Sequence, residues 1–381
     1  MNYRVTFRPL EPYTFGTDQT FAFAGTESEK TGKESYLAIS GRIPAQTTLW
    51  GTLRYLVLQK QEKLRRDFQY EGTEDLEPLI GARSFDFQSD TVQSFGKLHG
   101  MSPMFLIRQT EGGQERILIR NPFHNRAENQ GYCPMKLRET PLWTSHGSAG
   151  IHLPEDGEYN AKRGFADGWI DIADRKIYPT VWNPEAVAGE PAGRGLFASV
   201  MVPGNQKNRE SGDESYFQRE MILLHPACLF AVYVDAEEGT FTRPGESLPV
   251  ESVVYMGKKR SAFRVTVEES NAPPLNQAVK EAFTGTPEPW YYALSDSILL
   301  PENNYQDFCI VEETFQRTLK TNYNSHRRYA GKLVRSGIRF NLIRAGSVFY
   351  GSCPLTVNDN PGVLIQNCQT IGYHQIIKLG G

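Results

Sequence analysis

The sequence is poor in cysteine, and its cysteines are not spaced for metal binding. The five are Cys133, Cys228, Cys309, Cys353 and Cys368. Because no two of them form a CxxC pair, a zinc ribbon is excluded. An odd number of cysteines in a chain of 381 residues favours reduced, buried thiols and a cytoplasmic location.

Long hydrophobic runs are also missing. No segment approaches the ~20 apolar residues that are needed to cross a bilayer. The opening residues MNYRVTFRPLEPY carry charges and prolines where a signal peptide is apolar. We therefore expect a soluble intracellular protein that makes no use of a membrane.

Signatures of catalysis are absent as well. The sequence contains no Walker phosphate loop, no HExxH motif and no GxSxG motif. None of its seven histidines stands at ligand spacing from another histidine or from a cysteine. We expect no catalytic residue, no bound metal and no cofactor.

The chain does contain enough apolar material for a packed core. Hydrophobic residues make up 39% and aromatic residues 12% of the sequence, which excludes general disorder. At roughly 150 residues per domain, the length predicts two domains. The net charge of −3 excludes a globally basic nucleic-acid-binding protein but is compatible with a local basic face.

Alternating segments rich in β-branched and aromatic residues predict antiparallel strands. The expected strands and hairpins lie at 3–10, 115–123, 169–182, 253–270, 339–351 and 371–381. Two further strands are expected on either side of a polar loop at 203–217, and a linker at 270–277. Repeated strand-helix-strand units in two halves indicate an α+β fold with two antiparallel sheets.

One helix is indicated clearly, and it begins near Gln46. Leu49, Leu53 and Leu56 recur at helical spacing, and polar side chains at its start are able to cap it. A second helical stretch is expected near 311–322. Free N–H groups at the start of the first helix are a natural place for a phosphate.

Positive charge is concentrated at the C-terminal end. Between Thr314 and Gly381 the sequence has nine Lys or Arg residues and one acidic residue, Asp359, so this part carries +8 (9 − 1) and the remainder −11. Such asymmetry is expected of a chain with an acidic partner.

Three stretches carry candidate RNA contacts, and each has an ordinary structural interpretation beside the functional one. Residues 46–54 are either a core helix or a phosphate contact. Residues 257–263 are either a solvated turn or a basic turn on an RNA backbone, and the glycine there allows a close backbone approach or a positive φ. Residues 324–344 interleave cations with aromatics, as single-strand binders do, or dock onto an acidic subunit. The candidates are Gln46, Thr47, Thr48, Arg54, Gly257, Lys258, Lys259, Arg260, Ser261, Arg327 and Arg328.

An ordered set of motifs resembles subunit 3 of the Cmr complex, the type III-B CRISPR effector, which is a member of the RAMP superfamily. The motifs are RPLEPYTFG (8–16), IPAQTTLWGTLR (43–54), IGARSFDF (80–87), GKLHGMSP (96–103), GKKRSAF (257–263), RAGSVFYG (344–351) and IGYHQIIKLGG (371–381). The turn at 257–261 has a single glycine, where RAMP loops often have two or more.

This resemblance implies two ferredoxin-like (RRM-type) domains with antiparallel sheets and long insertions, at 1–270 and 286–381. It implies a non-catalytic subunit that holds the 5′ tag of the CRISPR RNA (crRNA) and contacts target RNA indirectly. The implied protein partners are the large cyclase–polymerase subunit and the backbone RAMP subunits. A β-hairpin thumb between guide and target is expected within 165–220.

Two other functions are left open by the residues. One is a metal-independent endoribonuclease that cleaves CRISPR repeats, with His99 as general base and Lys97 as a cation for the transition state. The other is a scaffold that binds only protein, through its basic C-terminal end. Cleavage of repeat RNA and crosslinking separate these alternatives from the tag-binding subunit.

Overall fold

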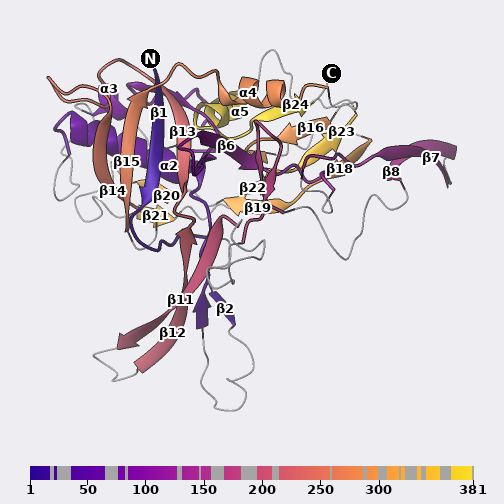
Figure 1. Ribbon diagram of the computed structural model, residues 1–381, viewed down its shortest axis with the longest axis horizontal. Helices are drawn as coiled ribbons and strands as arrows, with labels where there is room; N and C mark the ends of the chain where they lie inside the picture. Colours follow the sequence, from indigo (N-terminus) through magenta and orange to yellow (C-terminus); the bar gives the residue numbers. More distant parts are fainter. Residues whose placement is uncertain are drawn as a thin grey trace.

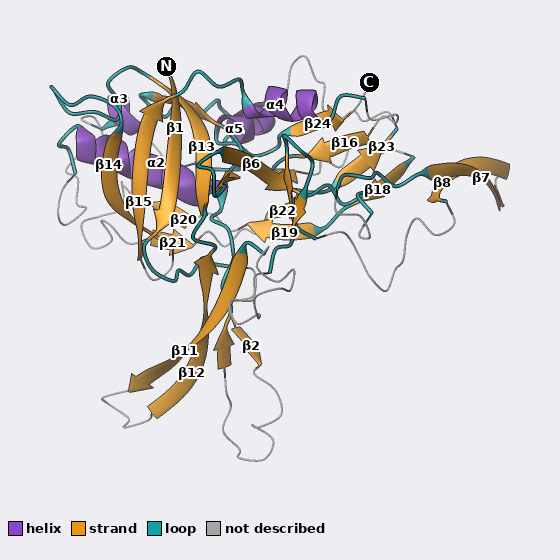
Figure 2. Cartoon of the chain, viewed as in Figure 1, coloured by secondary structure: helices purple, strands orange, loops and turns teal. Residues whose placement is uncertain are grey.

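The structure, a computed structural model, describes most of the chain. The described ranges are 1–17, 21–23, 36–64, 76–81, 85–126, 131–145, 147–155, 167–181, 195–207, 214–257, 260–285, 290–298, 307–316, 319–321, 333–335, 340–351 and 362–379. Strands dominate these ranges and most of them pair in antiparallel fashion (Figure 2). The predicted mixed α+β fold is confirmed.

The largest sheet has nine strands, in the order β10-β9-β6-β5-β13-β1-β15-β14, with β4 also paired to β13. Its strands are β1 (Asn2–Pro9), β4 (Leu98–Met101), β5 (Phe105–Gln109), β6 (Glu115–Arg120), β9 (Trp169–Asp171), β10 (Ile177–Tyr178), β13 (Cys228–Ala236), β14 (Val250–Met256) and β15 (Ser261–Glu269). The first strand therefore pairs with segments more than 200 residues away.

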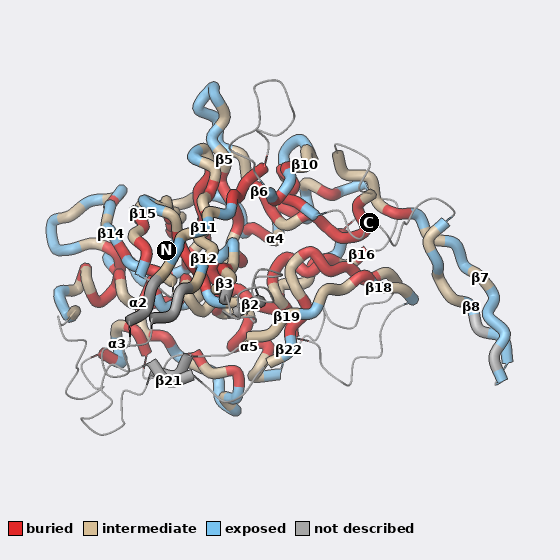
Figure 3. Tube along the Cα trace, turned by 90° about the horizontal axis from the view of Figure 1, so that it is seen from below, coloured by how far each residue is buried: buried red, intermediate tan, exposed pale blue. Residues whose placement is uncertain are grey.

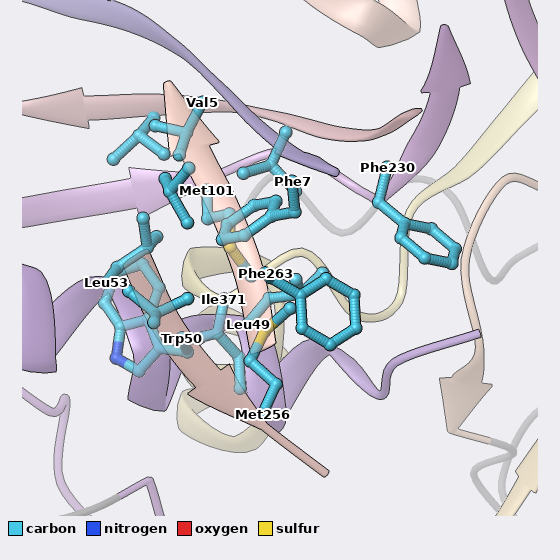
Figure 4. Packing of buried hydrophobic residues seen from close by; sticks show 14 of the residues in the cluster. Val5, Phe7, Leu49, Trp50, Leu53, Met101, Phe230, Met256, Phe263 and Ile371 are labelled. Atoms are coloured by element: carbon cyan, nitrogen blue, oxygen red, sulfur yellow. The ribbon is translucent and has the colours of Figure 1, made fainter. Parts of the chain in front are cut away.

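Helix α2 (Gln46–Lys60) packs on one face of this sheet. Alternate residues of the strands, such as Phe7 and Phe263, point toward Leu49 and Leu53 of the helix (Figure 4). All four side chains are completely shielded from solvent. Burial of apolar area of this kind contributes about 25 cal/mol per Å², so the sheet and the helix stabilise each other.

Within the described ranges the remaining strands form five smaller sheets, so the expectation of two sheets is wrong. One contains β11 (Phe197–Lys207), β12 (Glu214–Leu224), β3 (Tyr36–Ala38) and β2 (Phe21–Phe23); another contains β18 (Phe308–Ile310), β23 (Val348–Tyr350), β16 (Trp290–Ala293) and β24 (Ile376–Leu379). The others are β17 (Ser297–Ile298) with β22 (Phe340–Ile343) and β19 (Glu313–Gln316), β20 (Leu319–Thr321) with β21 (Leu333–Arg335), and β7 (Leu137–Thr144) with β8 (Gly147–Pro154).

Two hairpins project from the body of the molecule. The β11–β12 hairpin, with β2 and β3 beside it, extends downward in Figure 1, and the β7–β8 hairpin extends to the right. The tube in Figure 3 shows the β7–β8 hairpin as largely exposed along its length. We call these two elements the long arm (197–224) and the short arm (137–154).

Three short helices complete the described elements: α3 (Glu77–Ile80), α4 (Leu275–Ala282) and α5 (Val363–Thr370). Helix α4 buries Leu275 and Val279 in a second core, which joins the large sheet to the sheet that contains β16. The predicted division at 1–270 and 286–381 and the ferredoxin-like form of each part stay predictions.

Most of the expected strands are confirmed, including the hairpin of β9 with β10 and the strand–turn–strand of β14 and β15. Three local predictions are wrong. Residues 203–207 and 214–217 belong to the paired strands of the long arm and not to a loop. Residues 313–316 and 319–321 are strands and not a helix. Helix α4 begins at Leu275, within the predicted linker.

These errors have physical causes. The sequence of the long arm is polar between 205 and 215, so it gives no hydrophobic periodicity, and its strand pairing is decided by the neighbouring strand. Tertiary pairing decides the state of 313–316, which lie opposite β22. The expectation of buried thiols holds for Cys228 and Cys368 but not for Cys309, which is exposed.

No helix within the described ranges is long and apolar enough to span a membrane.

Candidate nucleic-acid interface

The turn between β14 and β15 is built around Gly257. Its φ angle is 79°, a left-handed conformation that residues with a Cβ rarely adopt. A Cβ atom at this position would lie 2.2 Å from the carbonyl oxygen of Thr14. The positive φ predicted for Gly257 is confirmed. The close approach that the structure shows is to Thr14 within the chain, and an approach to RNA stays a prediction.

The residues that follow Gly257 differ in exposure. Arg260 is exposed, and its guanidinium carbon lies 5.6 Å from the ring centroid of Tyr255. Ser261 is buried, and its hydroxyl donates to the carbonyl oxygen of Pro12 at 3.5 Å. Lys258 and Lys259 lie outside the described residues. Among the described residues, the turn therefore offers Arg260 to solvent and uses Ser261 to fix the strand that follows.

The start of α2 is not open to solvent in the way the sequence predicted. Its N-cap is Ala45, and no side chain caps it, so the predicted cap by Gln46, Thr47 or Thr48 is wrong. The N–H groups of Thr48 and Leu49 donate to the carbonyl oxygen of Ala45.

Gln46 is instead a buried connector between distant segments. Its side-chain amide nitrogen lies 3.1 Å from the carbonyl oxygens of Ser102 and Gly372 and 3.3 Å from that of Ile371. Its amide oxygen accepts from the backbone N–H of Met104. With 6% of its surface exposed, Gln46 holds the helix start against the C-terminal part of the chain.

The other candidates on α2 are also engaged inside the protein. Thr47 Oγ1 accepts a 3.2 Å bond from the side chain of Gln316. Arg54 is buried, and its Nε donates to the carbonyl oxygen of Ile80 at 3.0 Å. Thr47 and Thr48 are half-buried. The sequence did not reveal this because amphipathic spacing does not show which segment covers the start of a helix.

The basic C-terminal stretch 324–344 lies mainly outside the described residues, and Arg327 and Arg328 are among those outside. Arg344, at its end, forms an ion pair with Glu312 at 2.5 Å. One of the cations counted in the sequence is therefore neutralised within the fold.

A buried contact between His124, which follows β6, and Trp290 on β16 was not anticipated. His124 stacks on Trp290 with ring centroids 4.4 Å apart, and its Nε2 lies 2.7 Å from the hydroxyl of Tyr132. Complete burial lowers the pKa of His124 to about 3, because desolvation disfavours the imidazolium. The ring is therefore neutral at pH 7.

The proposed general base of the nuclease alternative lies on β4. Nδ1 of His99 is 3.9 Å from a carboxylate oxygen of Asp235, and both side chains are about half exposed. No group of three or more potential metal ligands occurs within the described ranges. The expectation that the chain has no catalytic residue stays a prediction.

The long arm carries a packed aromatic side chain, Phe217, that was not anticipated from the sequence. Gly204 lies opposite Phe217 in the β11–β12 register, and a Cβ at Gly204 would come within 2.4 Å of the Phe217 ring. The guanidinium carbon of Arg219 lies 5.3 Å from the centroid of the same ring. The signal was the alternation of Phe217 and Arg219, which places both on one face of a strand.

The fold and the site define this molecule as a mixed α+β protein of mainly antiparallel sheets. In its largest sheet, a turn that requires glycine at position 257 joins β14 to β15. A family model described as CRISPR-associated protein (Cas_Cmr3) matches residues 8–310. The chain belongs to this family, and the resemblance seen in the motifs is thereby confirmed.

Other comparisons give less. A solved structure, the Csm3–Csm4 subcomplex of the type III-A CRISPR-Cas interference complex, is similar over 99% of this chain and 98% of that chain, at 12% sequence identity and a TM-score of 0.34. At this TM-score the likeness does not define the fold. No curated protein matches the sequence.

Proposed function

We propose that this chain is a non-catalytic, RNA-binding subunit of a type III-B CRISPR effector complex, and that it holds the 5′ tag of the crRNA. Membership of the CRISPR-associated family over residues 8–310 carries the proposal. The two ferredoxin-like domains with insertions, and the large cyclase–polymerase and backbone RAMP subunits as partners, belong to the same proposal.

The turn at 257–261 is the contact that the geometry supports best. Gly257 brings the backbone close to Thr14 without a side chain between them, and Arg260 is exposed directly after it. RNA backbones are bound chiefly through phosphate charge. We assign the tag contact to this turn, and we assign Gln46 and Arg54 to positioning because both side chains are buried.

The long arm supports a second element of the proposal. It is a paired hairpin from Phe197 to Leu224, which overlaps the range 165–220 where a thumb was expected. Phe217 and Arg219 lie together on one face of the arm, and the combination of an aromatic ring with a cation is typical of single-strand binding proteins. We propose that the long arm is the thumb between guide and target RNA.

Crosslinking tests the tag contact directly. The chain is purified in its native complex, irradiated with ultraviolet light, and digested for mass spectrometry. Nucleotide adducts are expected on peptides that contain 257–261 and on the long arm. A complex that contains guide RNA but yields adducts at neither place contradicts the assignment and favours the scaffold that binds only protein.

A cleavage assay tests the absence of catalysis. Labelled repeat RNA is incubated with the chain without metal, and no cleavage is expected. Cleavage that disappears in His99→Ala, but not in the matched variant His152→Ala, overturns the non-catalytic assignment in favour of the nuclease.

A further inference from the structure

The face of the large sheet opposite α2 is open at the end formed by β1, β15 and β14. Figure 1 shows these three strands side by side in front of the helix. The register places Arg8, Arg264 and Val253 in one row across them. In the next row toward the Gly257 turn, the N–H of Leu10 donates to the carbonyl oxygen of Ala262, which lies opposite Tyr255.

In these two rows, three large apolar side chains are exposed to solvent. Leu10 and Val253 are each 47% exposed and Tyr255 is 57% exposed. Single exposed apolar residues are common on protein surfaces, whereas neighbouring ones on a single face mark an interaction site. We call Arg8, Leu10, Val253, Tyr255 and Arg264 the open-face patch.

The open-face patch carries two arginines, and the nearby carboxylate of Glu11 accepts the backbone N–H of Ala262. Arg8 and Arg264 stand directly opposite each other on β1 and β15, and like charges in this position destabilise a sheet. The side chain of Arg8 donates to neutral acceptors on Pro226 and Gln109. Within the described ranges neither Arg8, Arg260 nor Arg264 forms an ion pair.

The contrast with Arg4 on the same strand is informative. Arg4 lies two rows farther from the turn, and it pairs with both Glu115 and Glu268. Among the residues that the structure describes, the sheet thus pairs Arg4 with carboxylates at one end and leaves Arg8 and Arg264 without an ion pair at the other. An arrangement of this kind is complementary to carboxylates that come from another molecule.

We propose that the open-face patch docks a protein subunit that presents carboxylates around an apolar contact. RNA is disfavoured as the occupant because Leu10 and Val253 are aliphatic, and aliphatic side chains offer no surface for base stacking. Tyrosine and arginine beside an apolar centre are typical of protein interfaces. This inference depends on the proposed role of the chain as a subunit of an assembly.

A photocrosslinker in the open-face patch tests the identity of the occupant. Tyr255 is replaced by p-benzoylphenylalanine in the full chain, the native complex is purified and irradiated, and adducts are mapped by mass spectrometry. We expect an adduct to a peptide of another complex subunit that contains Asp or Glu. A nucleotide adduct, or no adduct, overturns the proposal. The same replacement at Glu251, one row beyond the patch, is the control.

A charge reversal provides a second test that does not depend on the crosslinker. Arg264→Glu places a carboxylate opposite Arg8, so the isolated chain is expected to be at least as stable as wild type. The crosslinked subunit is expected to copurify at least 10-fold less with Arg264→Glu and normally with Arg264→Lys. Unchanged copurification with Arg264→Glu contradicts the proposal.

The guide RNA in the same preparations separates this inference from the proposed function. Wild-type complex without crRNA contradicts the RNA-binding role and leaves the crosslink to be judged by itself. Wild-type complex that contains crRNA, with Tyr255 adducts confined to RNA, contradicts only the docking proposal.

Discussion

The start of α2 and the turn at Gly257 look alike in sequence but differ in the structure. In the sequence, both combine polar or basic residues with backbone N–H groups that were expected to be free, and both were expected to contact phosphate. The start of α2 is covered by Gln316, Ile371 and Gly372, whereas Arg260 beside Gly257 is exposed. A helix N-terminus attracts an anion only where an anion is able to reach it. The covered start therefore connects α2 to the segment at Ile371 and Gly372 and is not open to an anion.

The largest expected effect comes from removing the buried hydrogen bonds of the Gln46 side chain. Gln46→Leu leaves up to four buried backbone groups without a partner, and each such group costs about 1–3 kcal/mol. Since these costs are not additive, we expect a loss of roughly 4 kcal/mol in the free energy of unfolding. Urea denaturation measures it.

The control for this change is Gln61→Leu at the other end of α2. The side chain of Gln61 donates to Gly239 in an exposed setting, so its loss should cost less than about 1 kcal/mol. Equal effects of the two substitutions would contradict the role of Gln46 as a buried connector.

The next largest effect concerns the turn itself. Gly257→Ala requires a residue with a Cβ at φ 79° and within 2.2 Å of a backbone oxygen. Gly113 is a matched control because its φ is 76° and no atom of the described residues lies within 4 Å of the position that a Cβ would take there. We expect Gly257→Ala to lower the unfolding free energy by about 1–3 kcal/mol more than Gly113→Ala, since both share the cost of positive φ. Urea denaturation of the two variants gives this difference, and equal values would contradict the close approach to Thr14.

Acid acts on a second buried contact, the stack of His124 on Trp290, and not on the exposed turn. His124 has a folded-state pKa of about 3 and an unfolded-state pKa near 6.5. The unfolded chain therefore binds a proton that the folded chain excludes, and stability falls as the pH falls below 6.5. Between pH 7 and pH 5 the loss from His124 is about 2 kcal/mol.

Unfolding curves at several pH values measure this effect. His124→Gln removes the titrating group, so its curve should depend less steeply on pH in the range 5–7 than that of wild type. Equal pH dependence in the two proteins would show that His124 is not the group that titrates.

The smallest effect on stability, and the most direct on RNA, comes from the charges of the turn. Replacing Lys258, Lys259 and Arg260 together by Ala should weaken tag RNA binding and reduce the salt slope by roughly 0.7 for each phosphate that the turn no longer neutralises. Thr48→Ala, at the covered helix start, should leave the slope unchanged. Fluorescence anisotropy with the native complex over a range of salt concentrations distinguishes these outcomes. An unchanged salt slope in the triple variant would contradict the assignment of the tag contact to the turn at 257–261.

The sequence by itself determined the elements with strong local signals. The repeat of Leu49, Leu53 and Leu56 specified α2, and the alternation in 261–269 specified β15, because side-chain periodicity follows directly from backbone geometry. The glycine in the basic turn indicated a positive φ, since few other residues adopt it. The ordered motifs indicated the family.

Only the tertiary structure decided which of these elements remain accessible. Burial of Gln46 depends on Ile371 and Gly372, more than 300 residues away, and no local pattern encodes such a contact. The strands at 313–316 and 214–217 form because partners lie beside them. The open-face patch forms because the register of β1, β15 and β14 brings its residues side by side. Register is decided only when the sheet assembles.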